Sequence, residues 1–495
     1  MKNQMIRLAK NMVLYGLGAS LNRMLSVLLL PFMTTYLTPY DYGIVAILSI
    51  VSVFITTVFS LGLGSVIGAY YFDEKSDLHH GKVIWTATII LLATAAFLML
   101  VALPISPFLC RLLFGNETHT RLVALTIFTG ALNIVIVPRI LYSQFEEKIF
   151  SYQAIITGSS LLTTGFVLGF VIFLGRGIAG MVEGSAIAQL ISVILILTLA
   201  PSPKFSIAPS VGKTITKAGL GMVPAFAVLF LLSQSPRYLI QRISGLEATG
   251  LFNIAVSFAS PLAIVLGAFA RAWSPFFMSF TNRQDEAKAL FGRILLYFIY
   301  GFGTLTLLAV LFGRAGLLIL TTPAFHEAYK TMAWAAGIHI FTGIYSIMLP
   351  PLYFAKDVPK ISYIQAITAL LSIAASIPLI KYLGIRGNGA ALSSGYLIMA
   401  AVAFTWIKVN KDKYLDIIIP WKRILLFAPV FLLTTALASV TRDWGLGREL
   451  GTATVISLGI CLLTYNLLTP YEKRIGWQLG GRFIGKFIKP APDKS

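Results

Sequence analysis

Four arginines, Arg23, Arg139, Arg237 and Arg271, lie inside long apolar segments of the chain. Hardly any acidic residue occurs at the same depth to neutralise them. An arginine at the centre of a membrane span costs about 2.5 to 3.5 kcal/mol, so it normally faces protein or a water-filled cavity. Because a guanidinium group matches phosphate oxygens in a bidentate way, the pattern indicates a membrane protein that carries an anion.

The composition places the chain among polytopic membrane proteins. Of its 495 residues 57% are hydrophobic and only 12% are charged. The net charge of +20 comes from bases in short loops between apolar runs, where membrane topology selects for them, and predicts no nucleic-acid partner. Cys110 and Cys461 are far apart and lie in no Cys/His grouping, so no disulfide, metal or cofactor is predicted.

Fourteen stretches are long and apolar enough to cross a bilayer as helices, each needing about 20 residues. Membrane strands are excluded because the stretches are too long and too continuously apolar. The predicted spans are 11–33, 42–68, 82–104, 120–142, 151–174, 179–200, 216–241, 250–280, 291–313, 325–354, 361–380, 388–407, 421–440 and 451–469.

The distribution of basic residues predicts the orientation. Of 39 lysines and arginines, 25 fall on the side of the N-terminus and 10 on the other side, and the remaining four are the embedded arginines. Both termini are therefore expected in the cytoplasm, with the chain in the cell inner (plasma) membrane. The first apolar run is too long for a signal-peptide core and has no small-residue cleavage site, so it is predicted to be retained.

An internal repeat divides the chain into two similar halves. Leu141-Tyr142 matches Leu352-Tyr353, the glycine-rich turn at 174–180 matches 383–389, and Asp41-Tyr42-Gly43 matches Ala248-Thr249-Gly250, all at offsets of about 210 residues. Six spans per repeat predict two six-helix lobes related by a pseudo-two-fold axis along the membrane normal. The expected units are an N-terminal lobe at 1–205, a C-terminal lobe at 206–410, two further helices at 411–470 and a basic amphipathic tail at 471–495.

Several motifs resemble those of a known family. They are Tyr36-Leu37-Thr38-Pro39-Tyr40-Asp41-Tyr42-Gly43, the segments 245–252 and 272–276, and the turns at 175–180 and 384–389. Over roughly residues 5–410 the chain resembles polysaccharide (O-antigen) flippases of the Wzx type. These belong to the superfamily of multidrug, oligosaccharidyl-lipid and polysaccharide exporters.

The resemblance implies a transporter that is not an enzyme. Its substrate would be a polyprenyl-diphosphate-linked oligosaccharide, moved from the cytoplasmic to the outer leaflet for cell-surface polysaccharide synthesis. Membrane lipid, a polysaccharide polymerase and glycosyltransferases are the partners that such a role implies. The alternatives are a multidrug/cation antiporter of the same fold or a lipid II flippase. A membrane enzyme ranks last, because no catalytic motif or large extramembrane loop is found.

The four arginines differ in the helical face on which they lie. Arg23 shares a helical face with Gly16, Ala19, Ser20 and Ser26. Arg271 shares one with Ser260, Gly267 and Ser274. Both arginines are therefore predicted to line a central cavity between the two lobes. Arg237 has polar neighbours but stands near the outer boundary, where snorkelling is the competing interpretation. Arg139 follows Pro138 and could mark the cytoplasmic end of its span.

Two further residues could couple transport to an ion gradient. Glu183 is an acidic residue inside a predicted span, close to its outer end, where an interfacial carboxylate is the simpler interpretation. His339, near the middle of the tenth span, could titrate near neutral pH, although a packing role is the more common one for such a histidine.

Overall fold

The computed structural model describes residues 25, 27–72, 77–357, 359–427, 429–430, 434, 446–470 and 472–473. All regular elements in these ranges are helices. Those of the first half are α2 (Leu30–Tyr36), α3 (Pro39–Phe54), the π-helix η1 (Ile55–Phe59), α4 (Leu63–Tyr71), α5 (Asp77–Phe114), α6 (Thr120–Val135), α7 (Val137–Phe145), α8 (Ile149–Leu168), the π-helix η2 (Gly169–Phe173), α9 (Gly177–Leu199) and α10 (Pro209–Leu220). Those that follow are α11 (Val223–Met278), α12 (Gln284–Leu320), the 3-10 helix η3 (Pro323–Ala328), α13 (Tyr329–Met348), α14 (Pro350–Phe354), α15 (Pro359–Val409), α16 (Trp421–Leu425) and α18 (Leu446–Asn466).

Ten helical stretches of the described residues are long and apolar enough to cross a membrane. Two of them, α11 and α15, contain a non-helical glycine, Gly245 and Gly384, at which the chain turns back. These ten stretches therefore correspond to twelve of the predicted spans. The predicted span 11–33 and the predicted tail 471–495 lie largely outside the described residues, and the predicted span 421–440 lies outside them in part.

One predicted span contains a break between two helices. The seventh span was expected to begin at residue 216, but α10 ends at Leu220 and α11 begins at Val223. Gly219 and Gly221 weaken a continuous helix at this point, and Pro224 is favoured in the first turn of a new one. The basic residues Lys213 and Lys217 thus belong to a separate short helix.

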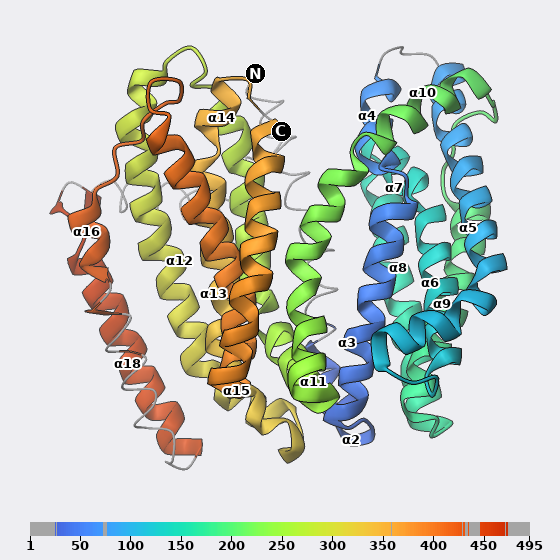
Figure 1. The fold of residues 1–495 in the computed structure, drawn as a ribbon, viewed down its shortest axis with the longest axis horizontal. Coiled ribbons are helices and arrows are strands. Elements are labelled where there is room, and N and C mark those ends of the chain that lie inside the picture. The colour runs from blue at the N-terminus through green and yellow to red at the C-terminus, as the bar shows by residue number, and fades with distance from the viewer. Residues whose placement is uncertain are drawn as a thin grey trace, which may run out of the picture.

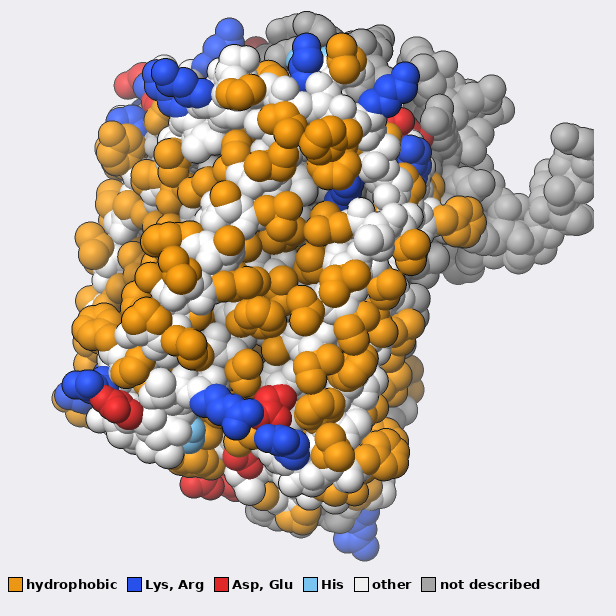
Figure 2. All heavy atoms as spheres, turned by 90° about the vertical axis from the view of Figure 1, so that its right-hand side faces the viewer, with side chains coloured by type: hydrophobic (Ala, Val, Ile, Leu, Met, Phe, Trp, Pro, Cys, Tyr) orange, Lys and Arg blue, Asp and Glu red, His pale blue; other side chains and the backbone are white. Residues whose placement is uncertain are grey.

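The helices gather into two groups, as Figure 1 shows, with α4 to α10 on one side and α12 to α18 on the other. The long helix α11 lies between them, beginning beside α10. Figure 2 shows one outer face of the first group, where hydrophobic side chains form a broad belt and Lys and Arg side chains collect above and below it. Such a belt between two charged margins is the surface that a bilayer requires, and the chain is a multi-pass membrane protein.

Backbone contacts at glycines join α3 to the part of α11 that follows Gly245. A Cβ atom on Gly43 would overlap the carbonyl oxygen of Leu246, and one on Gly250 would overlap that of Pro39. Gly43 and Gly250 are the glycines of the two matching repeat motifs. The repeats therefore meet through equivalent positions, and only glycine permits this approach.

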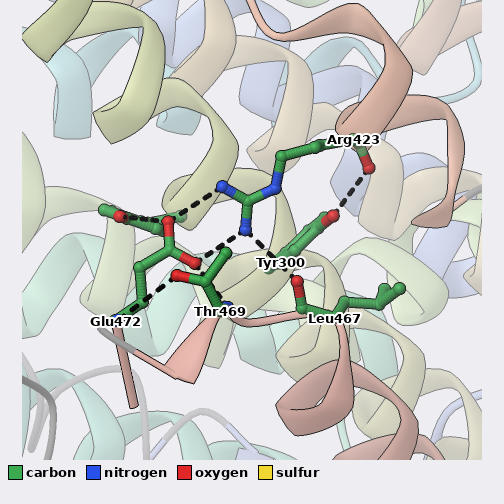
Figure 3. A network of polar contacts seen from close by, with 6 residues as sticks. Tyr300, Arg423, Leu467, Thr469 and Glu472 are labelled. Carbon is green, nitrogen blue, oxygen red and sulfur yellow. Dashed lines mark hydrogen bonds and ion pairs between the residues drawn. The ribbon is translucent and has the colours of Figure 1, made fainter. Parts of the chain in front are cut away.

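A polar network ties the C-terminal elements to α12 (Figure 3). The guanidinium of Arg423 donates from both terminal nitrogens to the Glu472 carboxylate, at 2.9 and 2.7 Å. Glu472 also accepts from the Tyr297 hydroxyl at 2.7 Å and from the Thr469 backbone N–H at 2.7 Å, while the Tyr300 hydroxyl donates to the Arg423 carbonyl. The bidentate Arg423 contact holds the pKa of Glu472 well below its usual range.

We predict that Gly250→Ala destabilises the folded protein, because the added methyl group overlaps the backbone of α3. Overpacking of this kind costs about 1 to 3 kcal/mol. Gly301→Ala is the matched control, since Gly301 lies within α12 facing open space and alanine favours helix there. Thermal unfolding of the two purified variants measures the difference, and equal unfolding temperatures would contradict the prediction.

We also predict a pH-dependent contribution from Glu472. Because its pKa is lowered in the folded protein, its carboxylate stabilises the fold above the unfolded pKa of about 4.3, and this stabilisation is lost as the pH falls through the lowered pKa. Glu472→Gln should therefore be less stable than the wild type at pH 7, with a gap that narrows below about pH 4. Glu286→Gln, which removes the partner of Arg283 in an exposed ion pair, is the control. A gap independent of pH would refute the assignment.

Candidate functional site

A cavity of about 480 Å³ opens between α2, α3, α8, α9 and α11. This volume lies within the roughly 300 to 1,000 Å³ of small-molecule sites. Its polar lining consists of neutral groups alone among the described residues: the hydroxyls of Ser159, Ser160, Thr163, Thr164, Ser185 and Ser257, the amides of Gln189 and Asn253, and the phenol of Tyr42. Such a surface can donate and accept many hydrogen bonds, but it offers no charge.

The hydroxyls come mainly from one face of α8. Ser159, Ser160, Thr163 and Thr164 recur at the helical spacing i, i+1, i+4 and i+5, which places them together. Another face of the same span, continuing into η2, carries Gly165, Phe166, Gly169 and Phe170, which line a separate apolar groove. A cavity-facing side and an apolar side thus occur on a single span. The two adjacent pairs Ser159-Ser160 and Thr163-Thr164 can be found in the sequence, but they were not among the predicted site residues.

Several of the polar groups in the cavity have unused hydrogen-bonding capacity. Thr163, Ser185 and Ser257 donate to carbonyls of their own helices, which leaves their oxygens able to accept. Gln189 is buried, with 6% of its surface exposed, and its amide nitrogen has no partner among the described residues. A buried donor without a partner is costly, so the site favours a ligand rich in hydroxyl oxygens.

The predicted anion site includes Arg139, which lies in α7 and is fully buried. Its guanidinium carbon stands 4.2 Å from the centroid of the Trp85 ring of α5, a cation–π contact. None of its three guanidinium nitrogens has a hydrogen-bond partner among the described residues. Arg139 does not line the hydroxyl cavity.

Arg237 lies in the first part of α11, eight residues before the turn at Gly245. It donates to the Gln234 side-chain oxygen at 2.7 Å, and its Nε has no partner among the described residues. The side-chain oxygens of Ser235 and Gln241 are also buried without a described partner. The predicted polar face of this span is therefore present, with part of its capacity unused.

Arg271 lies in the second part of α11, seven residues before the helix ends at Met278, and its side chain is exposed. A Cβ placed on Gly267 would lie 3.6 Å from an Arg271 Nη atom, so the guanidinium folds back over Gly267. That direction leads away from the nearer helix end and toward the interior of the span. Arg23, the fourth predicted arginine, lies outside the described residues.

The structure does not bring the described arginines to one point. Asn253, which lines the hydroxyl cavity, and Arg271 are 18 residues apart on the same arm of α11, or roughly 27 Å at 1.5 Å per residue. Arg237 and Asn253 each stand eight residues from Gly245 on opposite sides, so they lie at a similar depth. A ligand that reached from the cavity to Arg271 would have to be elongated.

The two predicted coupling residues differ in their surroundings. Glu183 is buried in α9 and receives Arg121 Nη2 at 2.8 Å, Arg176 Nε at 2.9 Å and Arg176 Nη2 at 3.0 Å. It thereby holds α6 against the turn that precedes α9. His339 lies half-buried in α13. Among the described residues no group of three His, Cys, Asp or Glu side chains could hold a metal ion.

Long apolar helices in two groups, with a neutral polar cavity among them, define a helical multi-pass membrane protein with an internal polar site. Residues 8–281 match the model of the family described as polysaccharide biosynthesis protein. The chain belongs to this family, which confirms the resemblance seen in its motifs. None of the curated proteins compared with the chain matches it.

Solved structures share the fold at low sequence identity. The lipid II flippase MurJ, in an inward closed conformation, is 14% identical, with a TM-score of 0.66 over 92% of this chain and 99% of that one. The multidrug transporter DinF-BH of the MATE family is 13% identical, with a TM-score of 0.60 over 83% of this chain and 96% of that one. An inward-facing multidrug resistance MATE transporter of the MOP superfamily is 14% identical, with a TM-score of 0.58 over 81% and 94%. The predicted fold class is confirmed.

We predict that Glu183→Gln destabilises the protein by about 1 to 3 kcal/mol, because it weakens charge-assisted bonds from two arginines. Glu117→Gln is the control, since its pair with Arg111 is exposed and contributes at most about 1 kcal/mol. Transport by the Glu183 variant should survive at permissive temperature. Loss of transport with unchanged stability would instead assign this carboxylate to coupling.

Proposed function

We propose that the protein is a flippase for a polyprenyl-diphosphate-linked oligosaccharide, moving it from the cytoplasmic to the outer leaflet of the inner membrane. The observation that carries the proposal is the cavity lined by hydroxyls and amides, with no charged residue among its described lining. Sugar rings present hydroxyl groups that such a surface binds. Membership in the polysaccharide biosynthesis family agrees with a glycan as cargo.

The diphosphate of the substrate requires cations, since a bare anion in hydrocarbon is prohibitively costly. Arg271 is exposed, is directed into the span and has no acidic partner among the described residues. We assign it to the diphosphate, with Arg23 as the expected companion from the other lobe. Arg237, which lies at the depth of Asn253, and Arg139, which is buried on Trp85 and does not line the cavity, are not assigned to it. Because the diphosphate is bonded directly to the first sugar, the distance of roughly 27 Å between Asn253 and Arg271 then requires an oligosaccharide long enough for its far sugars to reach the hydroxyl cavity.

Alternating access follows from the two groups of helices. Rocking of one group against the other would expose the cavity first to the cytoplasm and then to the outside. The contact between α3 and α11 at Gly43 and Gly250 is the natural pivot, because equivalent glycines of the two repeats bring the backbones together there. We propose cytoplasmic termini, and a polymerase and glycosyltransferases as functional partners.

The fold is shared with multidrug transporters, so a cation antiporter is the competing function. A cation binder would be expected to place a carboxylate in its cavity. The described lining has none. The flippase of the same fold, MurJ, acts on lipid II, and a lipid II substrate for this chain is a second alternative.

The test uses liposomes that contain the purified full chain and a fluorescent polyprenyl-diphosphate-linked oligosaccharide. We predict that Arg271→Ala lowers the flipping rate at least about tenfold. Arg271→Lys should retain an intermediate rate, because lysine keeps the positive charge but cannot bind phosphate in the bidentate way of a guanidinium group. Arg283→Ala, which removes an exposed arginine of a surface ion pair, should flip normally.

The sugar end is tested separately with Gln189→Leu and Thr163→Val. Both should lower the rate for the oligosaccharide substrate by several-fold and leave the rate for a polyprenyl diphosphate without sugars unchanged. Normal flipping in the Arg271 and Gln189 variants together would reject the site. Export of a cationic dye without flipping would reject the function in favour of an antiporter.

A further inference from the structure

A second cavity, of about 720 Å³, lies outside the region assigned to transport, between α5 and α10. Ile89 and Ile90 of α5 form part of its wall, and Lys213, Lys217 and Leu220 come from α10. In Figure 1, α10 lies at one end of the first group of helices. Figure 2 shows that side of the molecule, where basic side chains border the apolar belt.

The short helix α10 is fixed in place by its inner face. Gly212 packs so closely on α5 that a Cβ there would lie 2.9 Å from the Thr86 methyl group, and the Ala208 N–H donates to the Thr86 hydroxyl at 3.0 Å. At the other end Gly219 meets the backbone of Leu61 and Gly62. Both ends of α10 are therefore held by close contacts, and its remaining face lines the cavity between α5 and α10.

That remaining face combines charge with apolar surface. Lys213 and Lys217 are one turn apart, both are exposed, and neither has an acidic partner among the described residues. Thr216 and Leu220 are likewise one turn apart on α10 and line the same cavity. Ile89 of α5 is exposed in the facing wall. Two cations beside an apolar wall complement a phosphate attached to hydrocarbon chains.

The position along α5 places this cavity at the membrane boundary. The first turns of α5 carry His79, His80 and Lys82, and its continuous apolar run begins at Val83, so the membrane boundary lies near this point. Ile89 and Ile90 lie about 9 to 11 Å beyond Val83 along the helix, within the outer part of the hydrocarbon core. Trp85 stands one turn earlier, packs edge-on against Phe205 at 4.9 Å and donates its indole N–H to the Pro203 carbonyl at 3.0 Å. Tryptophan is enriched at membrane interfaces, which agrees with this position.

We propose that the groove between α5 and α10 binds an anionic phospholipid of the surrounding membrane. Lys213 and Lys217 hold the phosphate headgroup, and an acyl chain lies against Ile89, Ile90 and Leu220. This site is separate from the hydroxyl cavity between α2, α3, α8, α9 and α11, and it does not depend on the cargo that the protein transports.

The test measures lipid association with the full chain in bilayers by electron paramagnetic resonance. The probes are phosphatidylglycerol and phosphatidylcholine spin-labelled on an acyl chain. The wild type should retain phosphatidylglycerol preferentially as a motionally restricted component. Each lysine near an anionic headgroup is worth about fivefold in affinity, so Lys213→Ala with Lys217→Ala should weaken the preference roughly 25-fold at this site.

Two further variants separate the groove from general surface charge. Lys411→Ala with Lys422→Ala removes the same charge from exposed lysines of the other group of helices and should leave the preference unchanged. Ile89→Trp fills the apolar wall without changing the charge and should lower retention of the lipid. An equal loss in the Lys411 and Lys422 variant would overturn the proposal, and so would stronger retention of a polyprenyl phosphate than of phosphatidylglycerol.

Discussion

The close approach of α3 and α11 is the constraint on which the arrangement of the two groups of helices depends. In a membrane, helices gain little from burying apolar surface against each other, because lipid is equally apolar, so packing distance decides which helices associate. Gly43 and Gly250 allow two backbones to touch where any side chain would separate them. These glycines occupy matching positions of the internal repeat. Each of the two repeats therefore contributes one glycine to the contact between α3 and α11.

The α11 helix, which makes this contact, carries polar residues at several depths along its two arms. Its first arm carries Arg237 and Gln234, the turn at Gly245 reverses the chain, and the second arm carries Asn253 toward the hydroxyl cavity and Arg271 farther along. One continuous segment therefore reaches a neutral polar site and an exposed cation at different depths. In the proposed substrate, the sugars would extend from a diphosphate at the cation toward the neutral polar site.

Several carboxylates away from that segment pair with basic side chains near the ends of the helices. Glu183 binds Arg121 and Arg176 at one end of α9, and Asp357 receives Lys413 and the Tyr414 hydroxyl after α14. Those two hydrogen bonds lower the pKa of Asp357, which lies outside the membrane spans. Arg139 differs from these groups, since its cation is buried against Trp85 and its guanidinium nitrogens have no hydrogen-bond partner among the described residues.

The sequence by itself determined the class of fold, because apolar length, helical periodicity and the repeat are local or regularly spaced properties. It placed twelve described spans well, and it missed the break between α10 and α11, where two glycines and a proline act together. The arginines that it singled out, Arg139, Arg237 and Arg271, lie in the helices α7 and α11. Only the tertiary structure decided their surroundings. Arg139 is buried against Trp85, Arg237 donates a hydrogen bond to Gln234, and Arg271 is exposed and folds over Gly267. The hydroxyl cavity likewise required five helices to converge, and spacing within one helix cannot specify which other helices face it.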